Sequence, residues 1–356
     1  MVEETINGIK YKLPGSYTKK GTVSRGLTQF QKDMYVHLIN WKWKNITKDA
    51  GINIHKGEEI PYDAILPKSV HHTPPHIYPP VLNEFQNHNN TYKIKLHLHF
   101  YHMASSQAAN INLFLPILLN PKANEILSQL KPSDFDRLCT DSEYMYKGFR
   151  LEYWDGNADN EKGLLGDHNA RSGTDSDIAI AYYNKDKERC LWLIEHKLTE
   201  NEFTECGGFK SEGRNKSKHL CEKSFSEIIN DKHICYYHDV RKSEYWNITE
   251  EHQSFFANAN TRASCPFKGG MNQLWRNQLM GLALEKTGKY KHVYFSVVHH
   301  PENDALNESM NEYKQLIANN KKFSHFTSKD VINAADKIGD SAIDEWVSWY
   351  KGLYNV

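Results

Sequence analysis

Three charged residues stand at the ends of two apolar stretches, where their side chains could act together. Asp177 precedes the apolar run IAIAYY, and Glu195 and Lys197 follow the apolar run CLWLI. The polar segment NKDKE between these runs is centred on Asp186, nine residues after Asp177 and nine before Glu195. In a symmetric antiparallel hairpin Asp177 therefore lies opposite Glu195, with Cβ atoms about 5 Å apart. Lys197 shares the face of Glu195 because side chains alternate along a strand.

Two carboxylates and an ammonium group at this spacing suit metal-dependent hydrolysis of a phosphodiester. Opposed carboxylates repel each other unless a cation lies between them, and hard oxygen ligands favour Mg²⁺ together with a substrate phosphate. Such a cation activates water and stabilises charge on the phosphodiester, while a lysine binds a phosphate oxygen or orients the attacking water. The alternative is a screened surface network of little energetic value.

This interpretation depends on the register of the hairpin. A shift of two residues would place Asp175 opposite Glu195, and a shift of one residue would move the carboxylates to opposite faces. Asp177 is preferred because it directly precedes the apolar run. His196 is expected to point away from the site.

The surrounding pattern predicts an α/β fold with a mixed central sheet flanked by helices. The segment 93–102 alternates like a strand or the approach to a helix, and its histidines His97, His99 and His102 are expected to lie outside the site. The organisation predicted is a helical N-terminal extension over 1–92, a main domain over 93–356 and an insertion at about 200–266. Strands are expected at 148–156, 176–183, 189–199 and 292–298, and helices at about 28–45, 269–289, 305–319 and 328–352.

Composition gives no global argument for a partner. Lys and Arg number 44, as do Asp and Glu, so the net charge is zero and any DNA-binding surface must be local. No apolar run is long enough to span a bilayer, and the N-terminus lacks the apolar segment of a secretory signal. These features predict a cytoplasmic protein without a membrane partner, in which cysteines are free thiols or metal ligands.

The insertion gathers four cysteines and a basic stretch. Four thiols could hold Zn²⁺ or an iron–sulfur cluster, although the spacings are long and contain no C-x-x-C; the alternative is scattered reduced thiols. A structural metal is favoured because a polar stretch of about 65 residues needs something to order it. Basic side chains here would contact phosphates if they lie near the site, and otherwise form a solvated face. The residues are Cys206, Cys221, Cys235 and Cys265, with Arg214, Lys216 and Lys218; Cys139 and Cys190 are predicted to be core residues.

The order of these elements resembles the PD-(D/E)XK superfamily of nucleases, which includes many restriction endonucleases and recombination exonucleases. A narrower resemblance, over about residues 28–300, is to a bacterial family of restriction-endonuclease-like proteins. It rests on HMASSQAANINLFLPIL, GTDSDIAIAYY, IEHKLTENEF and MNQLWRNQ. The resemblance implies that Asp177, Glu195 and Lys197 form the catalytic core of a restriction-endonuclease-like fold and that Asp177 and Glu195 hold Mg²⁺.

Three further roles follow from the resemblance alone. Glu152 is the candidate for an additional metal-binding acid, with an exposed strand glutamate as the alternative. Gln273 is expected to face the site from the following helix, and Arg276 to contact phosphate.

The implied function is Mg²⁺-dependent cleavage of foreign DNA, and a homodimer is left open because enzymes of this fold are often dimers. The alternatives are a catalytically silent DNA-binding module, a DNA-repair or recombination exonuclease with a Cys-bound metal cluster, and a redox or sensing protein.

Overall fold

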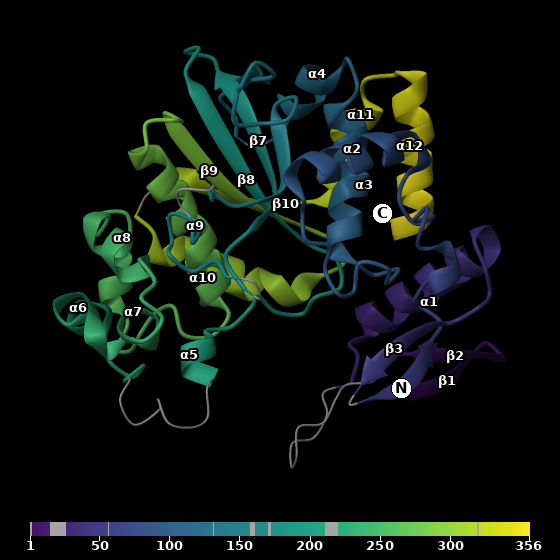
Figure 1. Ribbon diagram of the computed structural model, residues 1–356, viewed down its shortest axis with the longest axis horizontal. Helices are drawn as coiled ribbons and strands as arrows, with labels where there is room; N and C mark the ends of the chain where they lie inside the picture. Colours follow the sequence, from purple (N-terminus) through teal and green to yellow (C-terminus); the bar gives the residue numbers. More distant parts are fainter. Residues whose placement is uncertain are drawn as a thin grey trace.

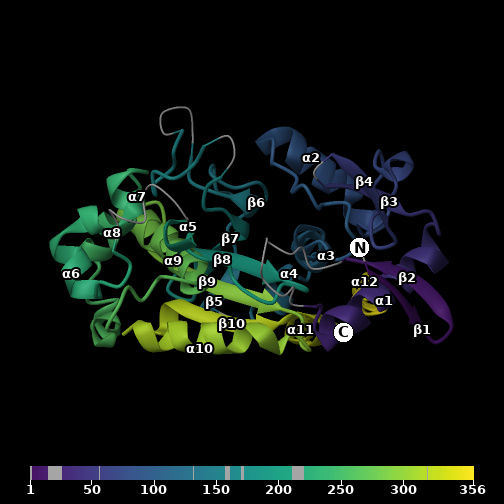
Figure 2. The same ribbon diagram turned by 90° about the horizontal axis from the view of Figure 1, so that it is seen from below.

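A six-stranded mixed sheet forms the centre of the molecule (Figures 1 and 2). The computed structural model describes residues 2–14, 26–55, 57–130, 132–156, 161–169, 172–210, 220–318 and 320–356. The strand order is β10-β9-β8-β7-β5, and β6 also pairs with β7. Strands β8, β9 and β10 are parallel, whereas β7 is antiparallel to β8, β5 and β6. This confirms the predicted mixed sheet. The strands are β5 (Phe135–Leu138), β6 (Phe149–Tyr153), β7 (Ser176–Asn184), β8 (Arg189–Lys197), β9 (His292–His299) and β10 (Phe323–Thr327).

Helices cover both faces of the sheet, and side-chain alternation assigns each strand residue to one of them. Even-numbered residues such as Ile180 and Trp192 belong to the core that contains α3, α11 and α12. Odd-numbered residues such as Ala179 and Leu193 belong to the core that contains α9 and α10. Odd-numbered charged residues at the same strand ends therefore face α9. The helices are α3 (Ser106–Leu118), α9 (Met271–Lys286), α10 (Asn307–Leu316), α11 (Ser328–Asp336) and α12 (Ser341–Tyr354), with the short α4 (Ala123–Leu127) beside β5.

The N-terminal region contains two β-hairpins and a second helix as well as the helix predicted at about 28–45. Thr28 caps α1, and Gln31 completes a capping box. Helix α1 packs against α12, and Met34 and Phe85 join the core of α3 and α12. The region thus shares a core with the main domain, and the boundary at residue 92 stays a prediction. The elements are β1 (Val2–Ile6), β2 (Ile9–Leu13), α1 (Gln29–Asn45), β3 (Gly51–His55), β4 (Glu58–Tyr62) and α2 (Leu82–Tyr92).

The insertion folds as short helices at the end of the sheet opposite to the N-terminal region (Figures 1 and 2). Its interior is aromatic: the rings of Phe267 and Trp275 stack with centroids 4.3 Å apart, and Trp246 packs beside both. Aromatic packing of this kind contributes beyond simple burial. The helices are α5 (Gly207–Lys210), α6 (Phe225–Asn230), α7 (Tyr236–Asp239) and α8 (Tyr245–Glu251).

Of the two alternatives for the segment 93–102, the structure shows the approach to a helix. The segment runs through turns into α3, where the Ser105 side chain accepts a hydrogen bond from the Ala108 N–H. The helix expected over 328–352 is divided into α11 and α12 because the chain turns at Gly339, whose φ of 67° favours glycine. Cys139 and Cys190 are fully buried, as predicted. No helix among the described residues could cross a membrane.

Candidate active site

Three carboxylates lie in a row across β6, β7 and β8. Ile178 pairs with Ile194, so the next residues along this register, Asp177 and Glu195, lie opposite each other. This is the register that the sequence predicted. On the other side of β7, the pairing with β6 brackets Glu152 and places it opposite Asp177. Directly opposed residues on regular neighbouring strands lie close together on one face, and Glu152 lines the same cavity as Asp177 and Glu195, so the row joins all three carboxylates.

Asp175 takes no place in this row. It forms an ion pair with His168, whose Nε2 lies 3.2 Å from Asp175 Oδ1, and the His168 ring stacks on Trp154 at 3.9 Å. The alternative pairing of Asp175 with Glu195 is therefore excluded by the register.

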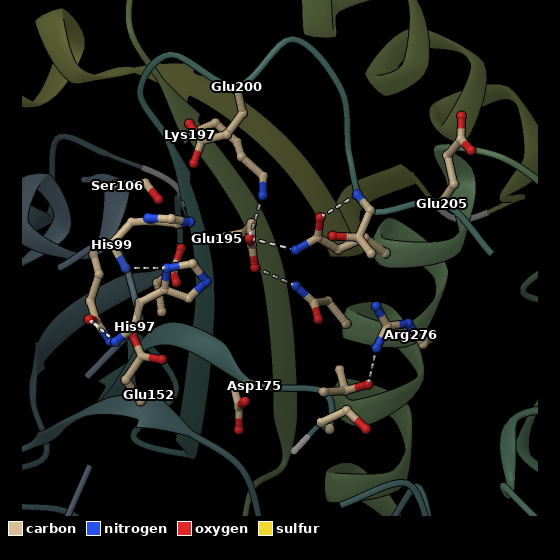
Figure 3. A pocket seen from close by; sticks show the side chains of 18 of the residues that line it. His97, His99, Ser106, Glu152, Asp175, Glu195, Lys197, Glu200, Glu205 and Arg276 are labelled. Atoms are coloured by element: carbon tan, nitrogen blue, oxygen red, sulfur yellow. Dashed lines mark hydrogen bonds and ion pairs between the residues drawn. The ribbon is translucent and has the colours of Figure 1, made fainter. Parts of the chain in front are cut away.

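Three side chains hold Glu195 in place, and Figure 3 shows Lys197 pointing towards it. Its Oε1 lies 3.0 Å from Lys197 Nζ and accepts a 2.7 Å hydrogen bond from Gln273 Nε2. Its Oε2 accepts a 2.9 Å hydrogen bond from Asn277 Nδ2. Gln273 and Asn277 are four residues apart on α9 and so share one face. The amide of Gln273 is itself fixed, since its Oε1 accepts from the backbone N–H of Thr204 at 2.9 Å.

Asp177 is oriented by the backbone of the neighbouring strand. Its Oδ2 accepts a 2.6 Å hydrogen bond from the His196 N–H, and α3 contacts it through Asn110 Nδ2, which donates to the Asp177 carbonyl at 3.0 Å. Burial, followed by the charges of Glu195 and Glu152, raises the pKa of Asp177 well above its ordinary value. The carboxyl is thus fixed in place and short of positive charge.

The Glu152 carboxyl is likewise short of neighbouring positive charge. Burial raises the pKa of Glu152 to about 8, and the charges of Asp175 and Glu195 add to this rise against the opposing effect of a hydrogen bond from Gln107. The backbone of Glu152 is strained, with φ at 47° in the left-handed region. It is therefore not the freely exposed strand glutamate of the alternative interpretation.

Lys197 is the only ammonium group that contacts the row among the described residues. It is 7% exposed. Burial lowers the pKa of Lys197, but the charges of Glu195, Glu200 and Asp177 outweigh burial and raise it above its ordinary value. Lys197 is therefore protonated throughout the neutral range.

The donor set fits a hard divalent cation. Three carboxylates face one ammonium, and Glu195 Oε2 retains a lone pair after its bond to Asn277. Mg²⁺ prefers such oxygen ligands. Across the described ranges, no three His, Cys, Asp or Glu side chains already stand at ion-binding distances, so ion binding requires the carboxylates to close together.

The row opens into a cavity of about 1110 Å³. Arg276 lines it and is held by two bonds, from Nη1 to Thr174 Oγ1 at 2.9 Å and from Nε to Asn272 Oδ1 at 3.0 Å. The opposite wall carries His97 and His99 (Figure 3), together with His102. The turns before α3 bring these histidines to the cavity wall, and the expectation that they take no part in the site stays a prediction.

Sequence reasoning also missed Asn277, although it lies one helical turn after the predicted Gln273 and on the same face. His196 was placed correctly: it is 1% exposed, lies on the opposite face from Glu195 and does not line the cavity. Burial lowers the pKa of His196 to about 3. Arg214, Lys216 and Lys218 lie outside the described residues.

Comparison with known proteins gives one match. A family model described as restriction endonuclease associating with ARP matches residues 47–355. No curated protein and no solved structure matches the chain. The matched range includes the whole central sheet, the carboxylate row and α9, and the family description supports a nuclease-type hydrolase. The chain belongs to the family of restriction endonucleases associating with ARP.

Proposed function

We propose that the protein is a Mg²⁺-dependent endonuclease that hydrolyses phosphodiester bonds of foreign DNA in the cytoplasm. The observation that carries this proposal is the row of Glu152, Asp177 and Glu195 with Lys197 bound to Glu195. Like charges on three neighbouring strands, one buried and two half-buried, are unfavourable for the fold alone. A site that binds a cation and a phosphate accounts for their position.

Each side chain has a role that follows from its contacts. Asp177 and Glu195 would hold Mg²⁺, with Glu152 as a third ligand; the bound ion supplies activated water and stabilises charge on the phosphodiester. Lys197 stays protonated, so it binds a phosphate oxygen and stabilises charge in the transition state rather than accepting a proton. Gln273, together with Asn277, fixes the orientation of Glu195.

The DNA backbone would enter the cavity beside α9. Arg276 lines this wall, and its guanidinium has donors beyond the two that Thr174 and Asn272 occupy. It is therefore proposed as a phosphate contact. Arg214, Lys216 and Lys218 would add contacts farther along the backbone, while a homodimer stays a prediction.

The test is cleavage of plasmid DNA with Mg²⁺ by the wild type and by Asp177→Asn, Glu195→Gln and Lys197→Ala. Each variant is expected to lose cleavage by at least about 100-fold. Asp186→Asn is the matched control, because it removes one carboxylate from the exposed turn of the same hairpin; it should cleave like the wild type. Cleavage unchanged in the three site variants contradicts the assignment. DNA binding by the wild type without cleavage of any DNA substrate favours a catalytically silent module.

A further inference from the structure

Four of the six cysteines surround one small cavity in the insertion. Cys206, Cys221, Cys235 and Cys265 all line a space of about 20 Å³. The backbone N–H of Cys265 also donates to the carbonyl of Cys221 at 3.3 Å. The thiols therefore converge, although they come from four separate segments of the chain.

Backbone N–H groups already point at three of these sulfurs. Cys206 accepts hydrogen bonds from the N–H groups two and three residues further on, and so does Cys235. Cys265 accepts one from the N–H group two residues further on. N–H donors that point at a sulfur favour a thiolate there over a thiol. The donors are Gly208 and Phe209, Tyr237 and His238, and Phe267.

A buried side chain adds a further donor. The indole Nε1 of Trp246 is buried without an oxygen or nitrogen partner among the described residues, and Trp246 lines the cysteine cavity together with Cys235. A buried donor without an oxygen or nitrogen acceptor is costly. A thiolate at Cys235 would satisfy it.

We propose that Cys206, Cys221, Cys235 and Cys265 bind one Zn²⁺ ion as thiolates and that this ion fixes the insertion against α9. Four thiolates form a closed tetrahedral site of the structural type. The proposal stands on the shared cavity and the N–H donors around it, and it does not depend on nuclease activity.

The small size of the cavity favours a single ion over a cluster. A space of about 10–15 Å³ is enough for one water-sized sphere, so the cavity of about 20 Å³ suits one ion. Because no three ligand side chains stand at ion-binding distances among the described residues, the sulfurs must move inward to reach Zn–S bonds of about 2.3 Å.

The ion would lie directly behind the wall of the candidate active site. Asn272 and Trp275 of α9 also line the cysteine cavity, while Gln273 on the same helix bonds to Glu195. Gly207, next to Cys206, donates its N–H to Tyr237 Oη at 3.2 Å, and both residues line the large cavity. The ion would thus hold the insertion and α9 in their relative positions.

The experiment is elemental analysis of the full chain, produced with added zinc and purified without chelators. One zinc per chain is expected, and Cys221→Ser with Cys265→Ser should lose it. Cys139→Ala and Cys190→Ala are matched controls, since these buried cysteines lie outside the cavity; they should retain it. Asp177→Asn should also retain zinc, which separates this site from the carboxylate row.

A second measurement covers the case in which the serine variants do not fold. X-ray absorption at the zinc edge of the wild type should show four sulfur neighbours at about 2.3 Å, and removal of zinc by a chelator should lower the melting temperature. The proposal is overturned if the wild type folds but contains no zinc, or if the ion has oxygen or nitrogen neighbours. It is also overturned if the protein shows iron–sulfur absorption or if the four cysteines form disulfides.

Discussion

Replacing Glu152 by glutamine is expected to stabilise the metal-free protein at neutral and alkaline pH. The Glu152 carboxyl is buried opposite Asp177, and its pKa is raised from 4.5 to about 8. A carboxyl with a raised pKa in the folded state binds its proton more tightly there than in the unfolded chain. Stability is therefore lost as pH rises from about 4.5 towards about 8, because only the unfolded chain releases the proton easily.

The magnitude follows from the width of this window. Each pH unit between the two pKa values costs about 1.4 kcal/mol, so at pH 7 the wild type gives up on the order of 3 kcal/mol. Glutamine keeps the shape and an acceptor for Gln107 but carries no charge, so Glu152→Gln should regain most of this free energy. Below pH 4 the two proteins should have similar stability, because Glu152 is protonated in both states.

Urea unfolding in EDTA at pH 4, pH 6 and pH 8 measures the difference. The gain of Glu152→Gln should grow with pH, while the control Asp186→Asn in the exposed turn should stay close to the wild type at every pH. Addition of Mg²⁺ should stabilise the wild type more than the variant, because an ion that binds only the folded state adds to its stability. If Glu152→Gln is no more stable than the wild type at pH 8, the carboxylate row is not under the electrostatic stress inferred here.

Two other outcomes are expected. Gln273→Ala and Asn277→Ala each remove one hydrogen bond from the buried Glu195 and should each lower the free energy of unfolding in urea by about 1–3 kcal/mol. Plasmid cleavage should fall by a larger proportion, measured at a temperature where the variants stay folded. Unchanged cleavage in both variants would show that Glu195 needs no orientation from α9. The triple variant Arg214→Ala, Lys216→Ala and Lys218→Ala should weaken binding to DNA of any sequence. Fluorescence anisotropy should show that the slope of log binding constant against log salt concentration falls by up to about 2.7. An unchanged slope would assign this stretch to a solvated face.

The hairpin could be predicted from the sequence because its signals are local. The turn NKDKE lies midway between Asp177 and Glu195, and apolar runs on both sides fix the pairing. The position of Glu152 could not be predicted in this way, since it depends on the pairing of β6 with β7 across a long loop. The backbone of Glu152 also departs from strand geometry, which no local propensity indicates.

Another element, the first β-hairpin, has a local sequence signal that was not used to predict it. Asn7 and Gly8 join β1 to β2, both with positive φ, and Asn-Gly between two short strands is a strong hairpin signal. The alternating pattern at 93–102 left open a strand or the approach to a helix, and a tertiary contact accompanies the second outcome: the His97 N–H donates to Gln107 Oε1 of α3 at 2.9 Å. That bond turns the segment towards the cavity and brings His97 to its wall.

The carboxylate row sets a structural requirement that extends well beyond the site. Three carboxylates can lie this close together only if neighbouring donors offset their repulsion, and the described donors to Glu195 are Lys197 and the two amides of α9. Gln273 and Asn277 can donate to Glu195 only while α9 keeps its present rotation about its own axis. The other face of α9 is packed through Trp275 against Phe267 of the insertion, beside the cysteine cavity. The insertion therefore acts as the support that holds α9 over the carboxylates, and loosening it should weaken the site without touching any residue in it.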